Sequence, residues 1–219
     1  MKISRIIFIS FFSVFTLFML SLTIQTEDRG KKMFDEMKQE KIALPAFSHL
    51  VIKDRCNVQL QYSPADTLKI GYFRGLILEK PIYTVVGDTL IIEPFPEQNG
   101  FYTNLSCSNL KSISIAHARL DISDYKCFKL KIDEMASTIY MNSSSSLDTL
   151  IMHCIDSNYR IDTKGLKSVQ VLLKKSRGEF YGGMIEEMKA ELLDTSQLST
   201  NKVLLTSIKA DESSRYFSR

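Results

Sequence analysis

The stretch SLDTLIMHCIDS, residues 146–157, is followed at residues 165–176 by GLKSVQVLLKKS, which has apolar residues at the same positions. Each stretch reads apolar, two positions, apolar, one position, apolar. In register from Leu110 this motif occurs six times, at steps of 17, 20, 19, 19 and 20 residues, which indicates an internal structural repeat. The copies are Leu110, Ile113, Ile115; Cys127, Leu130, Ile132; Leu147, Leu150, Met152; Leu166, Val169, Val171; Ile185, Met188, Ala190; and Leu205, Ile208, Ala210.

A second apolar run follows each copy after a corner. Seven residues beyond the central apolar position stands Leu120, Ser137, Ser157, Ser176 or Thr195, and Ser214 falls one residue short of that mark. The apolar members of the following run include Ile122, Ile139, Met141, Tyr159, Ile161 and Phe180. Alternation with period two is typical of a strand with one buried face. Each repeat therefore predicts two short strands, joined by a corner whose small hydroxyl residue bonds to local backbone.

A repeat of about 19 residues is too small to bury its own apolar face, so such repeats stack into a solenoid with ladders of like residues. Helical solenoids need roughly 33 residues or more per repeat. A leucine-rich repeat has a suitable length but requires Asn or Cys after the strand, where this chain has Arg119, Ala136, Asp156, Lys175 and Asp194. The sequence thus predicts an all-β fold, a β-solenoid with about 19–20 residues per turn, preceded by one N-terminal hydrophobic helix.

Residues 47–93 are less regular but carry the same pattern. FSHLVI places Phe47, Leu50 and Ile52 in the apolar frame of the repeat. NVQLQY, TLKIGY and DTLIIEP are further alternating runs, with turn signals at Ser63-Pro64 and Gly87-Asp88. We expect these segments to extend the solenoid.

Residues 1–25 form a distinct leader. Lys2 and Arg5 precede IIFISFFSVFTLFMLSLTI, residues 6–24, which contains no charge and is long enough to cross a bilayer core of about 30 Å as a helix. Basic residues on its N-terminal side keep that end in the cytoplasm. The run favours an uncleaved signal-anchor that binds the membrane through residues 6–24, and the alternative is a signal peptide cut near SLT, residues 21–23. No Cys closes the run, which argues against a lipidated mature N-terminus.

A charge-rich segment, residues 26–45, separates the leader from the repeats and ends at Pro45. Met33, Phe34 and Met37 fall on one side of a helical wheel, so this segment is either a short helix near the membrane or a solvated tether. The remaining residues, 46–219, form the predicted β-solenoid domain.

The composition of the 219-residue chain is that of a globular protein, with 44% apolar and 24% charged residues. The net charge of +3 arises from 28 basic and 25 acidic residues that are interspersed. Nucleic-acid binding requires a concentrated basic surface. We therefore exclude nucleic acid as a partner.

The sequence resembles the head GIN domain family of bacteria, also called "putative auto-transporter adhesin". The resemblance is carried by FSHLVIKDRCNVQLQYSPADTLKI (residues 47–70), by YTVVGDTLIIEP (residues 83–94) and by the later turns with hydroxyl corners. It implies an exported envelope protein built as a right-handed single-stranded β-helix. Two departures stand out: the corners read MASTI, DSNYR and KSRGE instead of a small Ser-Gly-Ala type, and the leader is longer than in many members and not lipidated.

The four cysteines are Cys56, Cys107, Cys127 and Cys154. An oxidising compartment permits disulfides, but Cys127 occupies a ladder position filled elsewhere by Leu or Ile, which predicts a small buried apolar residue. A Cys107–Cys127 disulfide requires an irregular first turn, because Cys107 lies three residues before its ladder position. The sequence leaves the disulfide state of all four open.

Few residues point to chemistry. A metal set drawn from His117, Asp133, Glu134, His153 and Cys154 lacks C-x-x-C or H-x-x-x-H spacing, and surface polarity at a strand end explains these residues equally well. Asp156 and Asp194 share a position two turns apart with Lys175 between them, about 9.6 Å by strand spacing, and we interpret them as a solvated edge. We assign no catalytic, cofactor-binding or metal residue and no cofactor.

We predict a non-enzymatic binding, adhesin-like or scaffolding module of the bacterial cell envelope, anchored in the inner membrane with the solenoid on the periplasmic side. A glycan or another envelope protein is its expected partner, and YMNSSSSLD, residues 140–148, is a weak candidate for a sugar-binding turn. One alternative is a polysaccharide-acting β-helix enzyme, which predicts a cleft of convergent carboxylates. Another is a structural subunit that pairs through an open C-terminal turn, including pairing with a second copy.

Overall fold

The computed structural model describes residues 12, 15–21, 37–73, 81–94 and 102–218. The chain forms two compact units, one of residues 1–38 and 72–76 and the other of residues 39–71 and 77–219. In the first unit residues 15–21 are helical, and Lys38 Nζ lies 5.4 Å from the centre of the Tyr72 ring. Among the described residues no helix is long and apolar enough to cross a membrane. The predicted membrane span, residues 6–24, lies mostly outside those residues.

Two sheets contain all the described strands. Sheet A has ten strands in the order β1-β4-β7-β3-β9-β11-β13-β15-β17-β19. Their bounds are β1 Met37–Ala43, β3 Asn57–Tyr62, β4 Thr67–Phe73, β7 Tyr102–Cys107, β9 Arg119–Ser123, β11 Thr138–Met141, β13 Asn158–Thr163, β15 Arg177–Gly182, β17 Gln197–Thr200 and β19 Arg215–Ser218.

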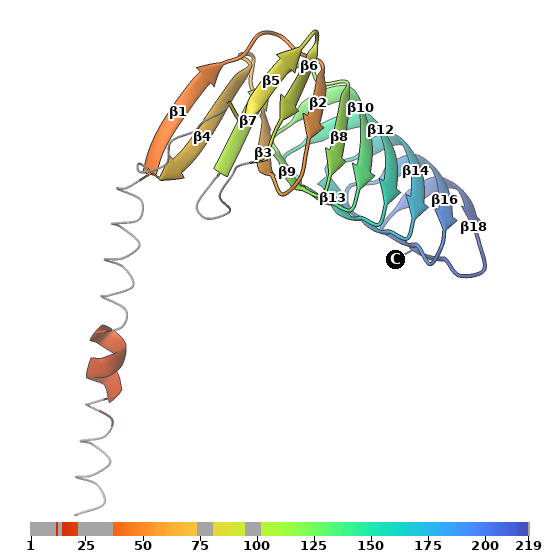
Figure 1. Cartoon of the computed structure of the whole chain (residues 1–219). Helices are drawn as coiled ribbons and strands as arrows, with labels where there is room; N and C mark the ends of the chain where they lie inside the picture. The colour runs from red at the N-terminus through yellow and green to blue at the C-terminus, as the bar shows by residue number, and fades with distance from the viewer. Residues whose placement is uncertain (1–11, 13–14, 22–36, 74–80, 95–101, 219) are drawn as a thin grey trace, which may run out of the picture. The chain divides into compact units, whose positions relative to one another are not determined.

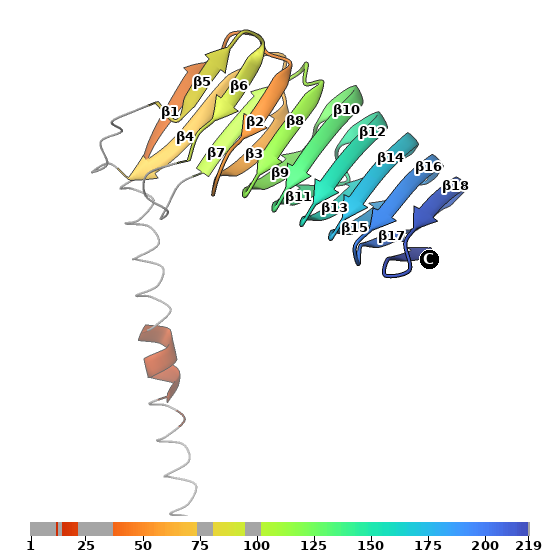
Figure 2. The same ribbon diagram turned by 45° about the vertical axis from the view of Figure 1, so that its right-hand side comes forward.

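Sheet B has nine strands in the order β18-β16-β14-β12-β10-β8-β2-β6-β5. Their bounds are β2 His49–Ile52, β5 Tyr83–Val86, β6 Thr89–Ile92, β8 Ser112–Ala116, β10 Lys126–Met135, β12 Ser146–Ile155, β14 Leu166–Lys174, β16 Ile185–Leu193 and β18 Val203–Ala210. Figures 1 and 2 show β8, β10, β12, β14, β16 and β18 side by side on one face, and Figure 2 shows β9, β11, β13, β15 and β17 along the other.

From β8 to β19 the chain makes about six turns of a β-solenoid, and each turn gives one strand to each sheet. Neighbouring strands are parallel throughout this region, so each turn pairs its backbone with the turns on either side. The predicted all-β solenoid is thus confirmed.

The core lies between the two sheets and consists of ladders of like residues. On sheet B, Leu130, Leu150, Val169 and Met188 are paired across four successive strands and are completely buried. On sheet A, the residues of the second apolar run, from Ile122 to Phe180, are buried as predicted. Burial of such side chains stabilises a fold by roughly 25 cal/mol per Å² of apolar surface, which is how one turn supports the next.

The repeat register is confirmed for the four middle copies and wrong for the first and the last. In the first turn Ile113 pairs with Ile132 and not with Leu130, because β8 has five residues against ten in β10. In the last turn Ile208 pairs with Ala190 and not with Met188. There β17 has four residues against six in β15, so the chain returns to sheet B early.

The hydroxyl corners between the two sheets form one continuous hydrogen-bonded ladder. The Oγ atoms of Ser137, Ser157, Ser176, Ser196 and Ser214 accept the backbone N–H of Ala118, Ser137, Ser157, Ser176 and Ser196, at 3.1, 3.2, 3.1, 3.2 and 3.0 Å. The predicted corner residues Thr195 and Leu120 are wrong. Ser196 takes the place predicted for Thr195 because Asp194 and Thr195 both adopt positive φ, and Leu120 is buried within β9.

The front half extends the solenoid out of sequence order. The β2–β3 pair lies between β6–β7 on one side and β8–β9 on the other, so β8 pairs with β2 from far earlier in the chain. Phe47, Leu50 and Ile52 are buried, as their frame predicts. Gly87, at φ 61°, makes the tight turn of the antiparallel β5–β6 hairpin.

One strand lies where the sequence predicted a tether or a short helix. Residues 37–43 form β1 at the edge of sheet A, next to β4. From residue 38 onward the residues of this strand are exposed or half-buried. Its sequence therefore lacks the alternation of apolar and polar residues that would predict a strand. An edge strand can be held by its backbone hydrogen bonds alone, without alternating apolar side chains. Residues 26–36 of the predicted tether lie outside the described residues.

Candidate binding face

Side chains on the outer face of sheet A bring arginine and aromatic residues together. Along β9, β11, β13 and β15 the buried residues alternate with outward ones. The strand register aligns Asp121, Tyr140, Arg160 and Glu179 in one column, one residue from each turn. The column continues through Ser199 to Phe217. We call this surface the outer face of sheet A.

Two arginine–tyrosine stacks lie on this face. The guanidinium of Arg119 lies 4.8 Å from the centre of the Tyr140 ring, and that of Arg160 lies 4.5 Å from the centre of the Tyr181 ring. Cation–π contact of this kind contributes about 0.5–1 kcal/mol at exposed sites and fixes the plane of the guanidinium. The stacks therefore hold flat, pre-oriented hydrogen-bond donors on an otherwise exposed sheet.

Carboxylates on the same face are already engaged. Asp121 accepts two bonds from Arg119, at 3.0 and 3.1 Å. Glu179 accepts 2.9 Å bonds from the Tyr181 hydroxyl and from Arg177. The Tyr181 hydrogen bond, followed by the bonds and charge of Arg177, lowers the pKa of Glu179. Both carboxylates therefore orient arginines, and the lowered pKa makes Glu179 unsuited to deliver a proton.

Two hollows lie next to each other on this face. One, of about 190 Å³, is lined by Tyr140, Arg160 and Asn158, among others, and the second, of about 540 Å³, is lined by Gln197, Phe217 and others. Arg177 and Glu179 line both. A ligand that fills both must therefore be extended along the stacking direction.

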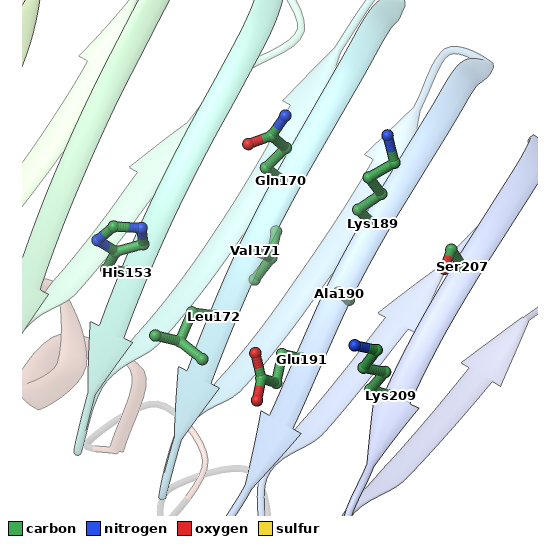
Figure 3. A pocket seen from close by; sticks show the side chains of 9 residues that line it. All are labelled: His153, Gln170, Val171, Leu172, Lys189, Ala190, Glu191, Ser207 and Lys209. Atoms are coloured by element: carbon green, nitrogen blue, oxygen red, sulfur yellow. The ribbon is translucent and has the colours of Figure 1, made fainter.

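The outer face of sheet B carries a different hollow, of about 480 Å³ (Figure 3). In Figure 3 Leu172, Glu191 and Lys209 follow one another on β14, β16 and β18, as the register requires. Its lining contains no Phe or Tyr, and His153 provides its one ring. Of these three hollows, those on the outer face of sheet A are therefore the ones lined by Phe or Tyr.

The residues considered for a metal site are separated by strand alternation. His153 Nδ1 and Asp133 Oδ1 lie 3.0 Å apart on the outer face of sheet B, whereas Glu134 and Cys154 are buried in the core. His117 is exposed at a corner, with φ 52°. Within the described ranges, no group of three or more His, Cys, Asp or Glu could hold a metal ion.

All four cysteines are free. Burial raises the pKa of the Cys56 and Cys127 thiols to about 11 and that of the Cys107 thiol to about 12. Cys56, Cys107 and Cys154 are buried, and Cys127 is half-buried at its ladder position. In this structure the cysteines therefore act as small apolar core residues without thiolate character.

The other sequence candidates take structural places. Asp156, Lys175 and Asp194 do share one corner column, with φ of 51°, 50° and 53°, and Asp194 pairs with Lys174 at 3.5 Å. In the serine run, the Oγ atoms of Ser144 and Ser145 accept the backbone N–H of Asp124 and Tyr125 at 3.0 and 3.2 Å. The serine run thus supports the preceding turn.

Sequence reasoning assigned no site residue, and it missed the arginine–tyrosine stacks. A signal was present: once the buried positions of the repeats are aligned, the outward positions between them are aligned too. Tyr140, Arg160 and Glu179 then fall in one column. The contact of Arg160 with Tyr181, which lies in a neighbouring column, could not be predicted from the sequence, because it depends on side-chain rotamers.

The sequence matches no family model and no curated protein. Solved structures do resemble it. A "putative adhesin" from Bacteroides fragilis has a TM-score of 0.61 at 11% identity, over 84% of this chain and 97% of that chain. A "putative lipid binding protein" from Parabacteroides distasonis has a TM-score of 0.53 at 12% identity, with the same coverage of 84% and 97%. At this identity the likeness shows the fold, and it agrees with the fold expected from the head GIN resemblance.

Proposed function

We propose that this protein is a non-enzymatic, adhesin-like binding module of the bacterial envelope that holds an extended glycan on the outer face of sheet A. The observation that carries the proposal is the pair of stacks, Arg119 on Tyr140 and Arg160 on Tyr181, beside two adjoining hollows. Tyrosine rings pack against sugar rings, and fixed guanidinium groups donate to hydroxyl or carboxylate oxygens. An extended polymer matches the repeat of the solenoid, because each turn offers a similar row of groups.

The absence of catalysis is part of the proposal. A glycosidase needs one carboxyl group that keeps its proton, usually through a raised pKa. On this face the pKa of Glu179 is lowered instead, first by the Tyr181 hydroxyl. The arrangement therefore favours holding a ligand over cleaving it.

The location of the protein is proposed from its leader and its neighbours. The uncharged run at residues 6–24 favours anchoring in the inner membrane, with the solenoid on the periplasmic side. The similar structures from Bacteroides and Parabacteroides are named for adhesion and for lipid binding, both of which are binding roles.

A glycan screen tests the proposed function. The full chain, purified in detergent, is applied to a panel of bacterial-envelope and host glycans. We expect saturable binding to one class of extended glycan, and at least about a tenfold weaker affinity after Arg160→Ala, which removes a stack and its donors. Gln170→Ala is the matched control, since Gln170 is an exposed residue on the outer face of sheet B.

Two results contradict the proposal. Equal loss of binding in the Arg160→Ala and Gln170→Ala variants places the ligand elsewhere. Shortening of the recovered glycan shows that the protein is an enzyme.

A further inference from the structure

A fourth, wider hollow lies around the starts of β2, β8, β10 and β12, away from the serine corners. Its volume is about 1220 Å³. Phe47 and Leu110 are buried beneath it, and Tyr62 and Phe128 stand at its sides with 43% and 74% of their surfaces exposed. The Tyr62 ring packs edge-on against the buried Tyr125 ring, with centroids 6.5 Å apart, so that wall is fixed to the core. We call this the corner groove.

Three lysines surround the corner groove. Lys111, Lys126 and Lys129 line it and are exposed. Each lacks a carboxylate within ion-pair distance among the described residues, whereas Asp148 in the following turn is taken by Lys167 at 2.6 Å. The single carboxylate of the lining, Asp88, accepts a 2.9 Å bond from Ser48 Oγ and lies 3.4 Å from His49 Nε2. Besides the Ser48 hydrogen bond, the charge of Lys111 also helps to lower the pKa of Asp88, so this carboxylate offsets part of the lysine charge and the groove keeps a net positive charge.

Phe128 is not required by the fold. Cys127 pairs with Leu147, so the residue that occupies the place of Phe128 in the next turn is Asp148. Lys167 and Glu186 hold the same place in the two turns after that. The fold therefore accepts charged side chains at this position in three other turns. The Phe128 ring is 74% exposed, so it does not contribute to the hydrophobic core. An exposed ring beside a second aromatic and three unpaired lysines is typical of an interaction site.

We propose that the corner groove docks on the anionic surface of a lipid bilayer. Phe128 enters the boundary between headgroups and acyl chains, and Lys111, Lys126 and Lys129 contact lipid phosphates. Surface-bound proteins combine apolar insertion with basic residues in this way, and each basic residue near an anionic surface strengthens binding about fivefold.

The order of the chain agrees with a membrane next to this groove. The predicted membrane run ends at residue 24, and Ala46 and Phe47, which line the groove, follow 22 residues later. The comparison of these positions along the chain is the one part of the proposal that rests on the proposed membrane anchor. The charge and the aromatic residues of the groove stand without it.

A tryptophan reporter tests the docking. The chain contains no Trp, so Phe128→Trp introduces a single fluorophore. The full chain is reconstituted in nanodiscs of phosphatidylcholine, or of equal parts phosphatidylcholine and phosphatidylglycerol, each with or without brominated acyl chains. We expect a blue-shifted emission that brominated lipid quenches in the anionic discs, and a loss of that quenching in neutral discs or at high salt.

Matched variants separate docking from mere proximity to the bilayer. In the Phe128→Trp background, Lys126→Glu with Lys129→Glu should abolish the quenching, and Lys164→Glu with Lys175→Glu, an equal charge change at exposed lysines elsewhere, should preserve it. Phe217→Trp, which reports from the last turn, should show no quenching.

Three results overturn the proposal: equal quenching in neutral and anionic discs, equal effects of the two lysine pairs, or a blue shift without bromine quenching, which indicates a protein partner or a second copy. If the chain does not co-purify with the discs, the proposed anchor fails, and anionic vesicles added to the free chain then decide the docking. Glycan binding on the outer face of sheet A is measured separately, so failure of one proposal leaves the other intact.

Discussion

At the residue scale, Glu134 is the least expected member of the core. It is 3% exposed, it pairs with Cys154 on the next strand, and neither of its carboxyl oxygens has a hydrogen-bond partner among the described residues. Burial raises the pKa of Glu134 from 4.5 to about 8, and the neighbouring Cys154 thiol acts in the opposite direction. Leu173 and Leu192 hold the equivalent place in later turns. Glu134 therefore occupies a position that the fold fills with apolar residues.

Glu134 should make the protein less stable as the pH rises. Below pH 4.5 the carboxyl group is protonated in both states, and above that pH the unfolded chain loses a proton that the folded chain keeps until about pH 8. The free energy of unfolding should fall with pH across this window, by up to about 1.4 kcal/mol per pH unit from this group. Glu134→Gln and Glu134→Leu should remove that slope, as measured by urea unfolding at a series of pH values. Curves that stay parallel to the wild type would show that Glu134 is not buried.

Gly178 provides space for a buried tyrosine. Tyr159 pairs with Gly178 across β13 and β15, and a methyl group on Gly178 would overlap the end of the Tyr159 ring. Gly178→Ala should cost about 1–3 kcal/mol through overpacking, as measured by chemical unfolding. Gly165→Ala is the control, because its added methyl would meet nothing closer than Met184 O at 3.5 Å. Similar costs for both would mean that the Tyr159 ring does not occupy this space.

At the element scale, the serine ladder holds the corners that join β10 to β11 and each later pair. Ser157 Oγ accepts the Ser137 N–H at 3.2 Å and donates to Ile155 O at 2.8 Å. The first four serines of the ladder thus satisfy backbone groups in their own turn and in the turn before, and Ser214 does so in the turn before. The ladder also secures corner residues at positive φ, such as Ala136 at 47°, where a side chain is normally disfavoured.

Removal of one hydroxyl from the ladder should destabilise the whole stack. Ser157→Ala leaves the buried Ser137 N–H without its partner and removes one of the two hydrogen bonds to Ile155 C=O, which keeps the bond from the Ala136 N–H. The variant should cost about 1–3 kcal/mol in the free energy of unfolding. Ser143→Ala, at an exposed residue of a nearby turn, should change it by less than about 0.5 kcal/mol. Thermal unfolding of both variants measures the difference. A Ser157→Ala variant as stable as Ser143→Ala would show that the ladder contributes nothing.

The elements differ in how far the sequence predicts them. The middle turns were predictable because a period of 19 or 20 residues fixes which side chains stack, as with Leu150 on Leu130. The end turns were not, because short strands such as β8 and β17 shift the register by two residues. The insertion of β2–β3 between later strands is a long-range pairing that no local pattern encodes. The arginine–tyrosine stacks required the register and the rotamers as well.

At the scale of the whole molecule, the last turn of the solenoid is packed differently from the turns before it. In β18 and β19 no described residue is buried, whereas β16 and β17 alternate between buried and exposed. Among the described strands none pairs with the outer edge of β18 or of β19, and Leu204 and Leu205 are 63% and 68% exposed. An uncapped terminal repeat has one neighbour instead of two, so it opens more readily than the interior.

Limited proteolysis should therefore begin at the C-terminal turn. Trypsin should cut after Lys202, Lys209 and Arg215 well before it cuts after Lys174 or Lys189, although all five are exposed. Mass spectrometry of early fragments gives the order. If the last turn resists trypsin as well as the interior turns do, another molecule covers it. That result would favour the alternative of a structural subunit that pairs through this end. The molar mass from light scattering then shows whether a second copy is the cover.

The central claim is that the outer face of sheet A holds a ligand without changing it, and hydrogen exchange with the bound glycan tests this most directly. With the glycan identified in the screen at saturation, we predict slower backbone exchange in β11, β13 and β15, unchanged exchange in β12 and β14, and recovery of the glycan at its original mass. Protection confined to sheet B or to the corner groove, or a glycan recovered in fragments, would contradict the account.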